Sequence, residues 1–241
     1  MSARPVVVTD IRRADAAIVD ALAEFGSATV HEAMGRIGYA GPRIRPIQQD
    51  AAISGSAITV LVAPGDNLMV HAAIEQSLSG DVIVVVPVTD SPYGFIGELM
   101  ATQMQTRGVR GYVTSGGVRD TGELRRMGFP VWTAHVSAEG TVKDTAGSVN
   151  VPVVLGGVVV NPGDVVVADD DGVTIVPRTL AADTLDAARA RAAKEAANRL
   201  RYAAGEISMD LNGLRPVLDD LGVTYLTQAD HRDRGAEDDD G

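Results

Sequence analysis

The expected order of strands and helices changes at one stretch of this 241-residue chain, Tyr112-Val113-Thr114-Ser115-Gly116-Gly117-Val118-Arg119-Asp120. The apolar residues from Val109 to Thr114 predict a buried strand, and the two glycines that follow predict a turn. Catalytic groups often lie on loops at strand ends, so the adjacent Arg119 and Asp120 are candidate functional residues. The same residues equally allow Asp120 to cap a helix that begins near Thr121, with Arg119 in a surface ion pair.

Strands and helices alternate before this stretch, whereas strands dominate after it. The segment 131–176 is expected to consist almost entirely of strands and turns. This order predicts an α/β protein of stacked sheet and helix layers and argues against a simple doubly wound sheet. The expected helices span 11–25, 27–37, 66–78, 94–106, 123–127, 179–204 and 208–221, and the expected early strands span 52–63 and 82–86.

The composition excludes several classes of function. A hydrophobic content of 45% is enough for one large domain, and no apolar stretch approaches the length of a membrane span, so we expect a cytoplasmic protein without membrane contact. The absence of cysteine excludes disulfides, thiolate nucleophiles and sulfur-ligated zinc. The net charge of −11 argues against nucleic acid as a partner. An acidic tail, 227–241, is expected to be disordered.

A second candidate segment runs from Gly94 to Met100. Its glycines allow a backbone to approach a ligand, and the start of a helix offers free N–H groups to a carboxylate. An ordinary glycine-punctuated helix start would look the same. The histidines lack a paired spacing, which makes zinc improbable, and Asp169-Asp170-Asp171-Gly172 is interpreted as a hairpin turn. Any metal should therefore be a hard, oxygen-ligated ion such as Mg²⁺ or Mn²⁺.

These residues together resemble a known family. Gly97-Glu98-Leu99, followed by Arg119-Asp120 with twenty residues between Glu98 and Arg119, is similar to the acidic-X20-Arg-Asp pattern of 4-hydroxy-4-methyl-2-oxoglutarate / 4-carboxy-4-hydroxy-2-oxoadipate aldolases and of RraA-like proteins. The resemblance extends from about Ile11 to Tyr225. Glu98 stands where many members have Asp, and Ser115 stands where an Asp often precedes the glycine. Recurring turns of the family match Pro64–Asn67, Asn161–Asp164 and Asp169–Val173.

The resemblance implies a fold and an assembly. It implies a layered β/β/α swivelling-type core over 1–178, and a C-terminal helical extension over 179–226 that contacts a neighbouring subunit. The expected assembly is a homotrimer or a homohexamer.

It also implies a site. Mg²⁺ or Mn²⁺ would be held by Asp120 and Glu195, and Arg119 would contact pyruvate. The backbone of Gly97, Leu99 and Met100 would hold the carboxylate of a 2-oxo acid. The remaining catalytic residues would be Glu98, Glu32 and Lys143, some of them from a neighbouring subunit.

The implied activity is that of a metal-dependent class II pyruvate aldolase with oxaloacetate decarboxylase side activity. Three alternatives stay open. One is a Schiff-base aldolase, for which Lys143 is a candidate because the chain has only one other lysine, Lys194. The second is a non-catalytic regulator of ribonuclease E of the RraA type. The third is a dedicated oxaloacetate decarboxylase.

Overall fold

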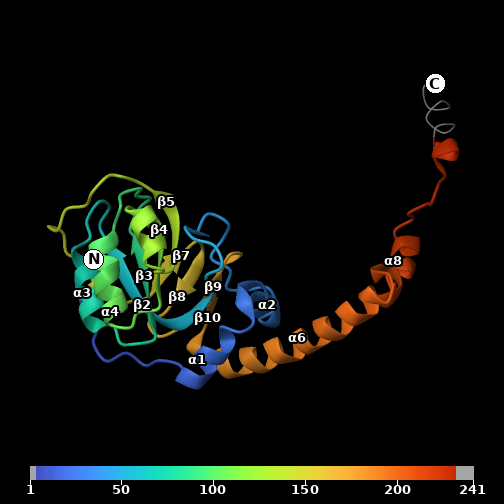
Figure 1. Ribbon diagram of the computed structural model, residues 1–241, viewed down its shortest axis with the longest axis horizontal. Helices are drawn as coiled ribbons and strands as arrows, with labels where there is room; N and C mark the ends of the chain where they lie inside the picture. Colours follow the sequence, from blue (N-terminus) through green and yellow to red (C-terminus); the bar gives the residue numbers. More distant parts are fainter. Residues whose placement is uncertain (1–3, 232–241) are drawn as a thin grey trace. The chain divides into compact units, whose positions relative to one another are not determined.

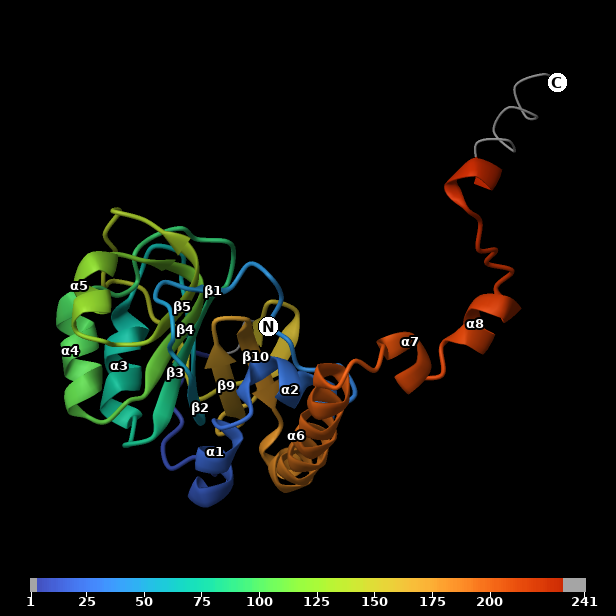
Figure 2. The same ribbon diagram turned by 45° about the vertical axis from the view of Figure 1, so that its right-hand side comes forward.

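The computed structural model describes residues 4–231, and the chain divides into two compact units, Met1–Ala192 and Ala193–Gly241. The first unit has three layers (Figures 1 and 2): helices α3, α4 and α5 cover one face of an eight-stranded mixed sheet, and the small β7–β8 sheet covers the other. The predicted layered β/β/α core is thus confirmed. The bounds of these outer elements are α3 Leu68–Gln76, α4 Glu98–Thr106, α5 Thr121–Arg126, β7 Val153–Leu155 and β8 Val158–Val160.

The centre of the sheet is parallel and its edges are antiparallel. The strand order is β1-β5-β4-β3-β2-β9-β10, and β6 pairs with β2. Strands β2 to β5 run parallel, as the alternation of strands and helices predicts, while β1 and β9 are antiparallel to their neighbours. The strands are β1 Arg45–Pro46, β2 Ile53–Val62, β3 Asp81–Pro87, β4 Gly111–Val118, β5 Val131–Val136, β6 Ser148–Val149, β9 Val165–Asp169 and β10 Gly172–Val176.

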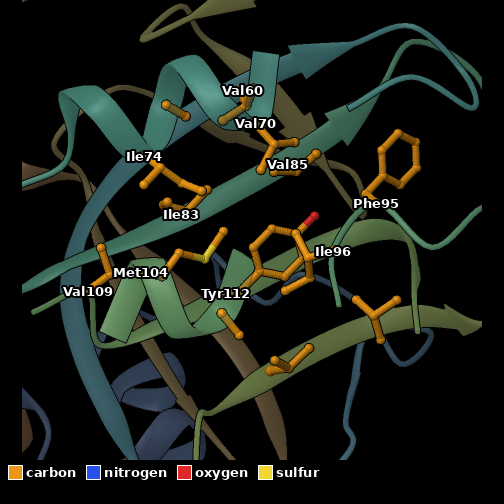
Figure 3. Close-up of a cluster of buried hydrophobic side chains, with 14 of the residues drawn as sticks. Val60, Val70, Ile74, Ile83, Val85, Phe95, Ile96, Met104, Val109 and Tyr112 are labelled. Carbon is orange, nitrogen blue, oxygen red and sulfur yellow. The ribbon is translucent and has the colours of Figure 1, made fainter. Parts of the chain in front are cut away.

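Strand β3 shows how one strand packs against both outer layers. All seven of its residues are buried. Because side chains alternate along a strand, Ile83 and Val85 face the helices, whereas Val82 and Val84 face the β7–β8 sheet. Figure 3 shows Ile83 and Val85 in the helix-side cluster with Tyr112 of β4. A parallel sheet covered on both faces requires such an unbroken apolar run.

A third buried cluster joins helices α1 (Ala16–Leu22) and α2 (Gly26–Ala33) and the start of α6 (Ala181–Ala203) to β9 and β10. Both N-terminal helices are shorter than predicted. The carboxylate of Asp15 accepts hydrogen bonds from the N–H groups of residues 17 and 18 and thereby starts α1. The carboxylate of Asp169, beside the β9–β10 turn, accepts from the N–H and the hydroxyl of Ser27 at the start of α2.

Three further predictions differ from the structure. Gly116 and Gly117 do not form a turn: they lie inside β4, where the register with β5 shifts between Thr114 and Gly117. Residues 94–97 are not helical, because Gly94 bridges to Gly117 and α4 starts at Glu98. The predicted helix 208–221 is two helices.

The second unit begins inside α6 and contains α7 (Ser208–Leu211) and α8 (Arg215–Asp220). Gly213, at a positive φ of 61°, and the proline at the start of α8 explain the break between these two helices. Most of the predicted tail, 232–241, lies outside the described residues. Within residues 4–231, no helix is long and apolar enough to cross a membrane.

Candidate active site

The motif residues line a cavity of about 340 Å³ where β4 ends, beside the starts of α3 and α4. Three chain segments distant in sequence form its walls: the turn that leads into α3, the segment that leads into α4, and the loop after β5. Its lining comprises Asn67, His71, Gly94, Phe95, Ile96, Gly97, Leu99, Met100, Arg119, Asp120, Gly140, Thr141 and Lys143.

The backbone fixes Arg119 and Asp120 at this place. The N–H of Arg119 donates to the carbonyl of Ile96 at 3.0 Å, which continues the contact between the 94–97 segment and the end of β4. Asp120 then adopts the left-handed conformation, with φ 55° and ψ 35°. This conformation is uncommon for a residue with a side chain, and Asp is among those that tolerate it best.

The carboxylate of Asp120 does not cap its own helix, α5, which rejects the capping alternative. Its Oδ2 instead accepts from the N–H of Glu98, at 3.1 Å, across the cavity mouth at the start of α4. Arg119 Nε lies 3.6 Å from the same oxygen, and both side chains are partly exposed. The guanidinium and the carboxylate are therefore adjacent and open to a ligand.

Two glycines make this approach possible. A Cβ on Gly97 would collide with Oδ2 of Asp120, so the start of α4 reaches the carboxylate only because residue 97 has no side chain. A Cβ on Gly117 would collide with the carbonyl of Pro92. The glycines of β4 therefore allow the 91–95 segment to pack closely against the strand. This close packing, and not a turn, explains why glycine occupies these two positions.

The start of α4 offers hydrogen-bond donors to the cavity. The first turn of any α-helix leaves N–H groups without intrahelical acceptors. The N–H of Glu98 is taken by Asp120, and the next two residues, Leu99 and Met100, line the cavity. Their N–H groups and the helix dipole favour an anion at this point.

The loop after β5 supplies a second cation, the ammonium group of Lys143. His71 of α3 lies in the same lining, and burial together with the positive charge of Lys143 lowers the pKa of His71. Since the unperturbed value is already below 7, His71 is neutral at neutral pH. The positive charge in the cavity therefore comes from Arg119 and Lys143.

The predicted site residues divide into two groups. The cavity brings together six of them, namely Gly97, Leu99, Met100, Arg119, Asp120 and Lys143. Glu98 contributes its backbone N–H to Asp120, while its carboxylate accepts from the hydroxyl of Thr102 at 2.9 Å and is not part of the lining.

The other two predicted residues are not in this cavity. Glu32, on α2, accepts from Arg36 and lies 3.4 Å from Arg191. Its helix packs against β9 and β10, whereas the cavity lies beyond the end of β4. Glu195 belongs to the second unit.

Sequence reasoning missed two contributors, Asn67 and His71. Asn67 Nδ2 donates to the carbonyl of Phe95 at 2.9 Å and contacts the sulfur of Met100 at 3.3 Å, so it holds two cavity walls together. The Pro64–Asn67 turn was recognisable, but its partners are about 30 residues away along the chain. No local pattern indicates that contact.

The donor set fits a weakly held Mg²⁺ or Mn²⁺. Across residues 4–231, no group of three or more His, Asp or Glu side chains could enclose a metal ion. Mg²⁺ commonly binds one or two protein carboxylates and keeps several waters or substrate oxygens. Asp120 has one oxygen that accepts from Glu98, and its other oxygen is the hard donor that such an ion needs.

A larger cavity, of about 430 Å³, lies elsewhere, beside Arg43, Asp90 and Ser115. The hydrogen bond from His135 lowers the pKa of Asp90, and Arg43 lies 3.8 Å away, so these charges are already compensated. Of the stretch Tyr112–Asp120 only Ser115 lines it, and none of the nine predicted site residues does. We therefore place the candidate site in the smaller cavity, which Arg119, Asp120 and Lys143 line together.

Comparisons with known proteins agree on one family. The family described as RraA-like (Aldolase/RraA) matches residues 16–175. A protein of Halalkalibacterium halodurans named "Putative 4-hydroxy-4-methyl-2-oxoglutarate aldolase" is 34% identical over 154 residues, covering 64% of this chain and 73% of that protein. A protein of the same name from Burkholderia multivorans is 33% identical over 148 residues, covering 61% and 90%.

A solved structure gives the same answer for the fold. The crystal structure of Streptomyces coelicolor RraAS2, described as an unusual member of the RNase ES inhibitor RraA protein family, is 28% identical with a TM-score of 0.72. The match covers 79% of this chain and 99% of that one. The family match spans the helix-covered sheet and every segment of the cavity, so this chain belongs to the RraA-like (Aldolase/RraA) family.

Proposed function

We propose that this chain is a divalent-metal-dependent class II pyruvate aldolase. Its substrate would be 4-hydroxy-4-methyl-2-oxoglutarate or 4-carboxy-4-hydroxy-2-oxoadipate, cleaved to pyruvate and a second 2-oxo acid. The observation that carries the proposal is the convergence of Arg119, Asp120 and the start of α4 in one cavity. The names of two relatives, 33–34% identical, point to the same reaction.

The cavity suits an organic polyanion. Arg119 presents a planar fork of donors, the start of α4 presents N–H groups, and Lys143 adds a second positive charge. In the proposed complex, the N–H groups of Leu99 and Met100 bind the carboxylate beside the keto group. Arg119 donates to the keto oxygen.

The proposed chemistry begins with the C4 hydroxyl of the substrate. A base removes its proton, the C3–C4 bond breaks, and the electron pair moves into the enolate of pyruvate, which is then protonated at C3. Mg²⁺ or Mn²⁺ beside Asp120 would act as a Lewis acid on the keto group. Arg119 stabilises the negative charge that develops on the enolate oxygen, and pre-oriented donors of this kind commonly contribute more than any other group.

The base in this proposal is a water molecule held by Glu98 or a neighbour. The Glu98 side chain is partly exposed and its carboxylate accepts from Thr102, so in this proposal it acts through water and not by direct contact. Loss of carbon dioxide from oxaloacetate yields the same enolate. The proposal therefore includes oxaloacetate decarboxylation as a side activity.

The test is pyruvate release from both hydroxylated diacids and from oxaloacetate, with magnesium and with a chelator. Asp120→Asn should abolish turnover, because Asn tolerates the left-handed conformation but lacks the charge that holds the cation. Asp219→Asn, a charge-matched change in α8, should leave turnover unchanged. Full activity in Asp120→Asn, or in the presence of chelator, would refute the proposal.

Glu32 and Glu195 enter this proposal as groups supplied by another copy of the chain in a trimer or hexamer. Two inactive variants can test this. Asp120→Asn and Glu195→Ala chains, unfolded together and refolded as mixed assemblies, should regain part of the activity because some sites then combine two intact halves. Mixtures that stay as inactive as the separate variants would contradict the shared site.

The competing function is that of a non-catalytic RraA-type regulator of ribonuclease E. The likeness to RraAS2, which extends over 99% of that chain, favours it. A regulator would bind and inhibit the ribonuclease without releasing pyruvate. Inhibition that persists in Asp120→Asn, combined with no turnover in the unaltered chain, would favour the regulator.

A further inference from the structure

The turn between β2 and α3 joins the walls of the cavity. The N–H of Gly65 donates to the hydroxyl of Ser91 at 3.1 Å, and Asn67 donates to Phe95. The same turn also contacts the loop that carries Lys143, because the N–H of Val142 donates to the carbonyl of Gly65 at 2.9 Å. One four-residue turn thus contacts the segment before α4 and the loop after β5.

Asp66 makes the tightest of these contacts. Asp66 is only 2% exposed, and its carboxylate accepts hydrogen bonds from three backbone N–H groups. Oδ1 accepts from Leu68 at 2.8 Å, and Oδ2 accepts from Asp144 at 2.7 Å and from Thr145 at 2.6 Å. Burial alone would raise the pKa of Asp66, but these N–H groups outweigh it and lower the pKa, so the carboxylate is charged at neutral pH.

Lys143 lies directly between the two fixed points of this loop. Residue 142 pairs with the Gly65–Asn67 backbone, and residue 144 donates to Asp66. The Lys143 side chain is long and free to change rotamer, so the place of its ammonium group depends on where its backbone is held. The buried carboxylate of Asp66 anchors that backbone.

We propose that Asp66 is a positioning residue that holds Lys143 where it binds the second carboxylate of a 2-oxo diacid, the one remote from the keto group. This inference rests on the proposed function and deepens it by naming the basis of substrate choice. The start of α4 and Arg119 are occupied by the pyruvoyl end. Of the two cationic side chains in the cavity lining, Lys143 is the one that remains.

Asp66→Asn tests this role. An amide has one acceptor oxygen where the carboxylate has two. The Asn side chain can satisfy Leu68, or the pair Asp144 and Thr145, but not both sets. The volume is unchanged, so the variant loosens the loop or the start of α3 without leaving a cavity.

The chain contains a matched control at Asp164. This residue is also buried, 3% exposed, and follows a Pro-Gly turn. It also accepts three N–H groups: the backbone N–H of Asn161 at 2.8 Å, Nδ2 of Asn161 at 3.1 Å, and the N–H of Arg178 at 3.0 Å. None of these residues lines the candidate site. Asp164→Asn should therefore lower the free energy of unfolding by a similar amount without changing substrate binding.

The first arm of the experiment is kinetic. With 4-hydroxy-4-methyl-2-oxoglutarate, whose second carboxylate is kept in the product, Asp66→Asn should raise KM about 10-fold and change kcat less than about 3-fold, because uniform binding is lost. The inhibition constant of pyruvate, which has only one carboxylate, should not change. Asp164→Asn should alter none of these values. Equal effects in both Asn variants, or an unchanged KM in Asp66→Asn, would overturn the inference.

The second arm does not need turnover. The chain has two lysines, so acetylation by acetic anhydride reports on Lys143 with Lys194 as an internal reference. The probe is 2-oxoglutarate with magnesium, a diacid that lacks the hydroxyl needed for cleavage. It should protect Lys143 in the unaltered chain and in Asp164→Asn, and should fail to do so in Asp66→Asn.

The two arms separate the inference from the proposed function. Protection that follows this pattern in a chain without turnover supports the positioning role and refutes the aldolase. Turnover with Lys143 equally protected in all three chains, or protected in none, overturns the positioning role and leaves the aldolase intact.

Discussion

The two units of the chain differ in how they are stabilised. The first contains three buried apolar clusters and all of the candidate cavity. In the second, none of the residues from 193 to 231 is buried. Nine of its large apolar residues are exposed, at 38–75%: Leu200, Tyr202, Ile207, Leu214, Val217, Leu221, Val223, Tyr225 and Leu226.

The two units therefore differ in where their apolar side chains are covered. A helix without a buried face is marginal in water, since most helical stability in proteins comes from packing. The first unit has its packing within itself. The second unit has large apolar side chains that its own packing leaves uncovered, and we propose that a second copy of the chain covers them.

The largest expected effect concerns activity and lies wholly in the first unit. Arg119→Ala should lower kcat/KM by about 10³-fold or more, because in the proposed reaction the guanidinium stabilises the developing enolate. The midpoint of thermal unfolding should stay the same, since the side chain is about half exposed. Arg126→Ala, which removes an exposed arginine paired with Glu123 on α5, is the control and should leave kcat/KM unchanged.

A pair of leucines tests the difference in packing. Leu124→Ala, at a fully buried site in α5, should lower the free energy of unfolding by about 2–5 kcal/mol. Leu221→Ala, at a site 73% exposed, should change it by less than about 0.5 kcal/mol in dilute monomer. Urea denaturation measures both. A large cost for Leu221→Ala at all concentrations would show that the second unit is buried within its own chain.

Truncation after Gly205 removes α7 and α8 but keeps all of α6. We expect the shortened chain to unfold at nearly the same temperature at low concentration, because the three buried clusters remain. It should assemble less strongly, since most of the exposed apolar residues are gone. Sedimentation over a range of concentrations measures this, and an identical distribution for both chains would exclude a role in assembly.

The smallest effect is the acid dependence contributed by Asp66. Its pKa is lowered in the folded state, so it stabilises the fold above its ordinary value of 3.8. That contribution disappears as the pH falls through the lower, folded value. Asp66→Asn should therefore be less stable at neutral pH and should lose less further stability on acidification. Parallel curves of unfolding free energy against pH for the two chains would contradict this.

The sequence predicted the parts of the fold that depend on local pattern. The Val and Ile run of β3 is buried on both faces, and the turn at 169–172 is the β9–β10 hairpin. The glycines of β4 were misinterpreted because their reason is tertiary: they admit the 91–95 segment, 20 or more residues away. A glycine in a turn and a glycine at a close approach look alike in one sequence.

The site was predictable to the same degree. Arg119 and Asp120 are neighbours, and the segment 97–100 has a helix start, so a motif can identify both. The contacts of Asp66 and Asn67 join residues 28 to 79 positions apart and leave no periodicity. The sharing of a site between copies, as proposed for Glu32 and Glu195, depends on assembly, so no local sequence pattern can predict it.

The bare backbone at Gly97 offers a tool for separating two biological roles. A methyl group there would push the Asp120 carboxylate aside, while the extended conformation of residue 97, φ −140°, suits alanine without strain. Gly97→Ala would thus yield a folded chain that retains every charge but has the Asp120 carboxylate displaced. Introduced into cells that lack the native gene, it would show which phenotypes need the proposed reaction and which need only the protein's outer surface.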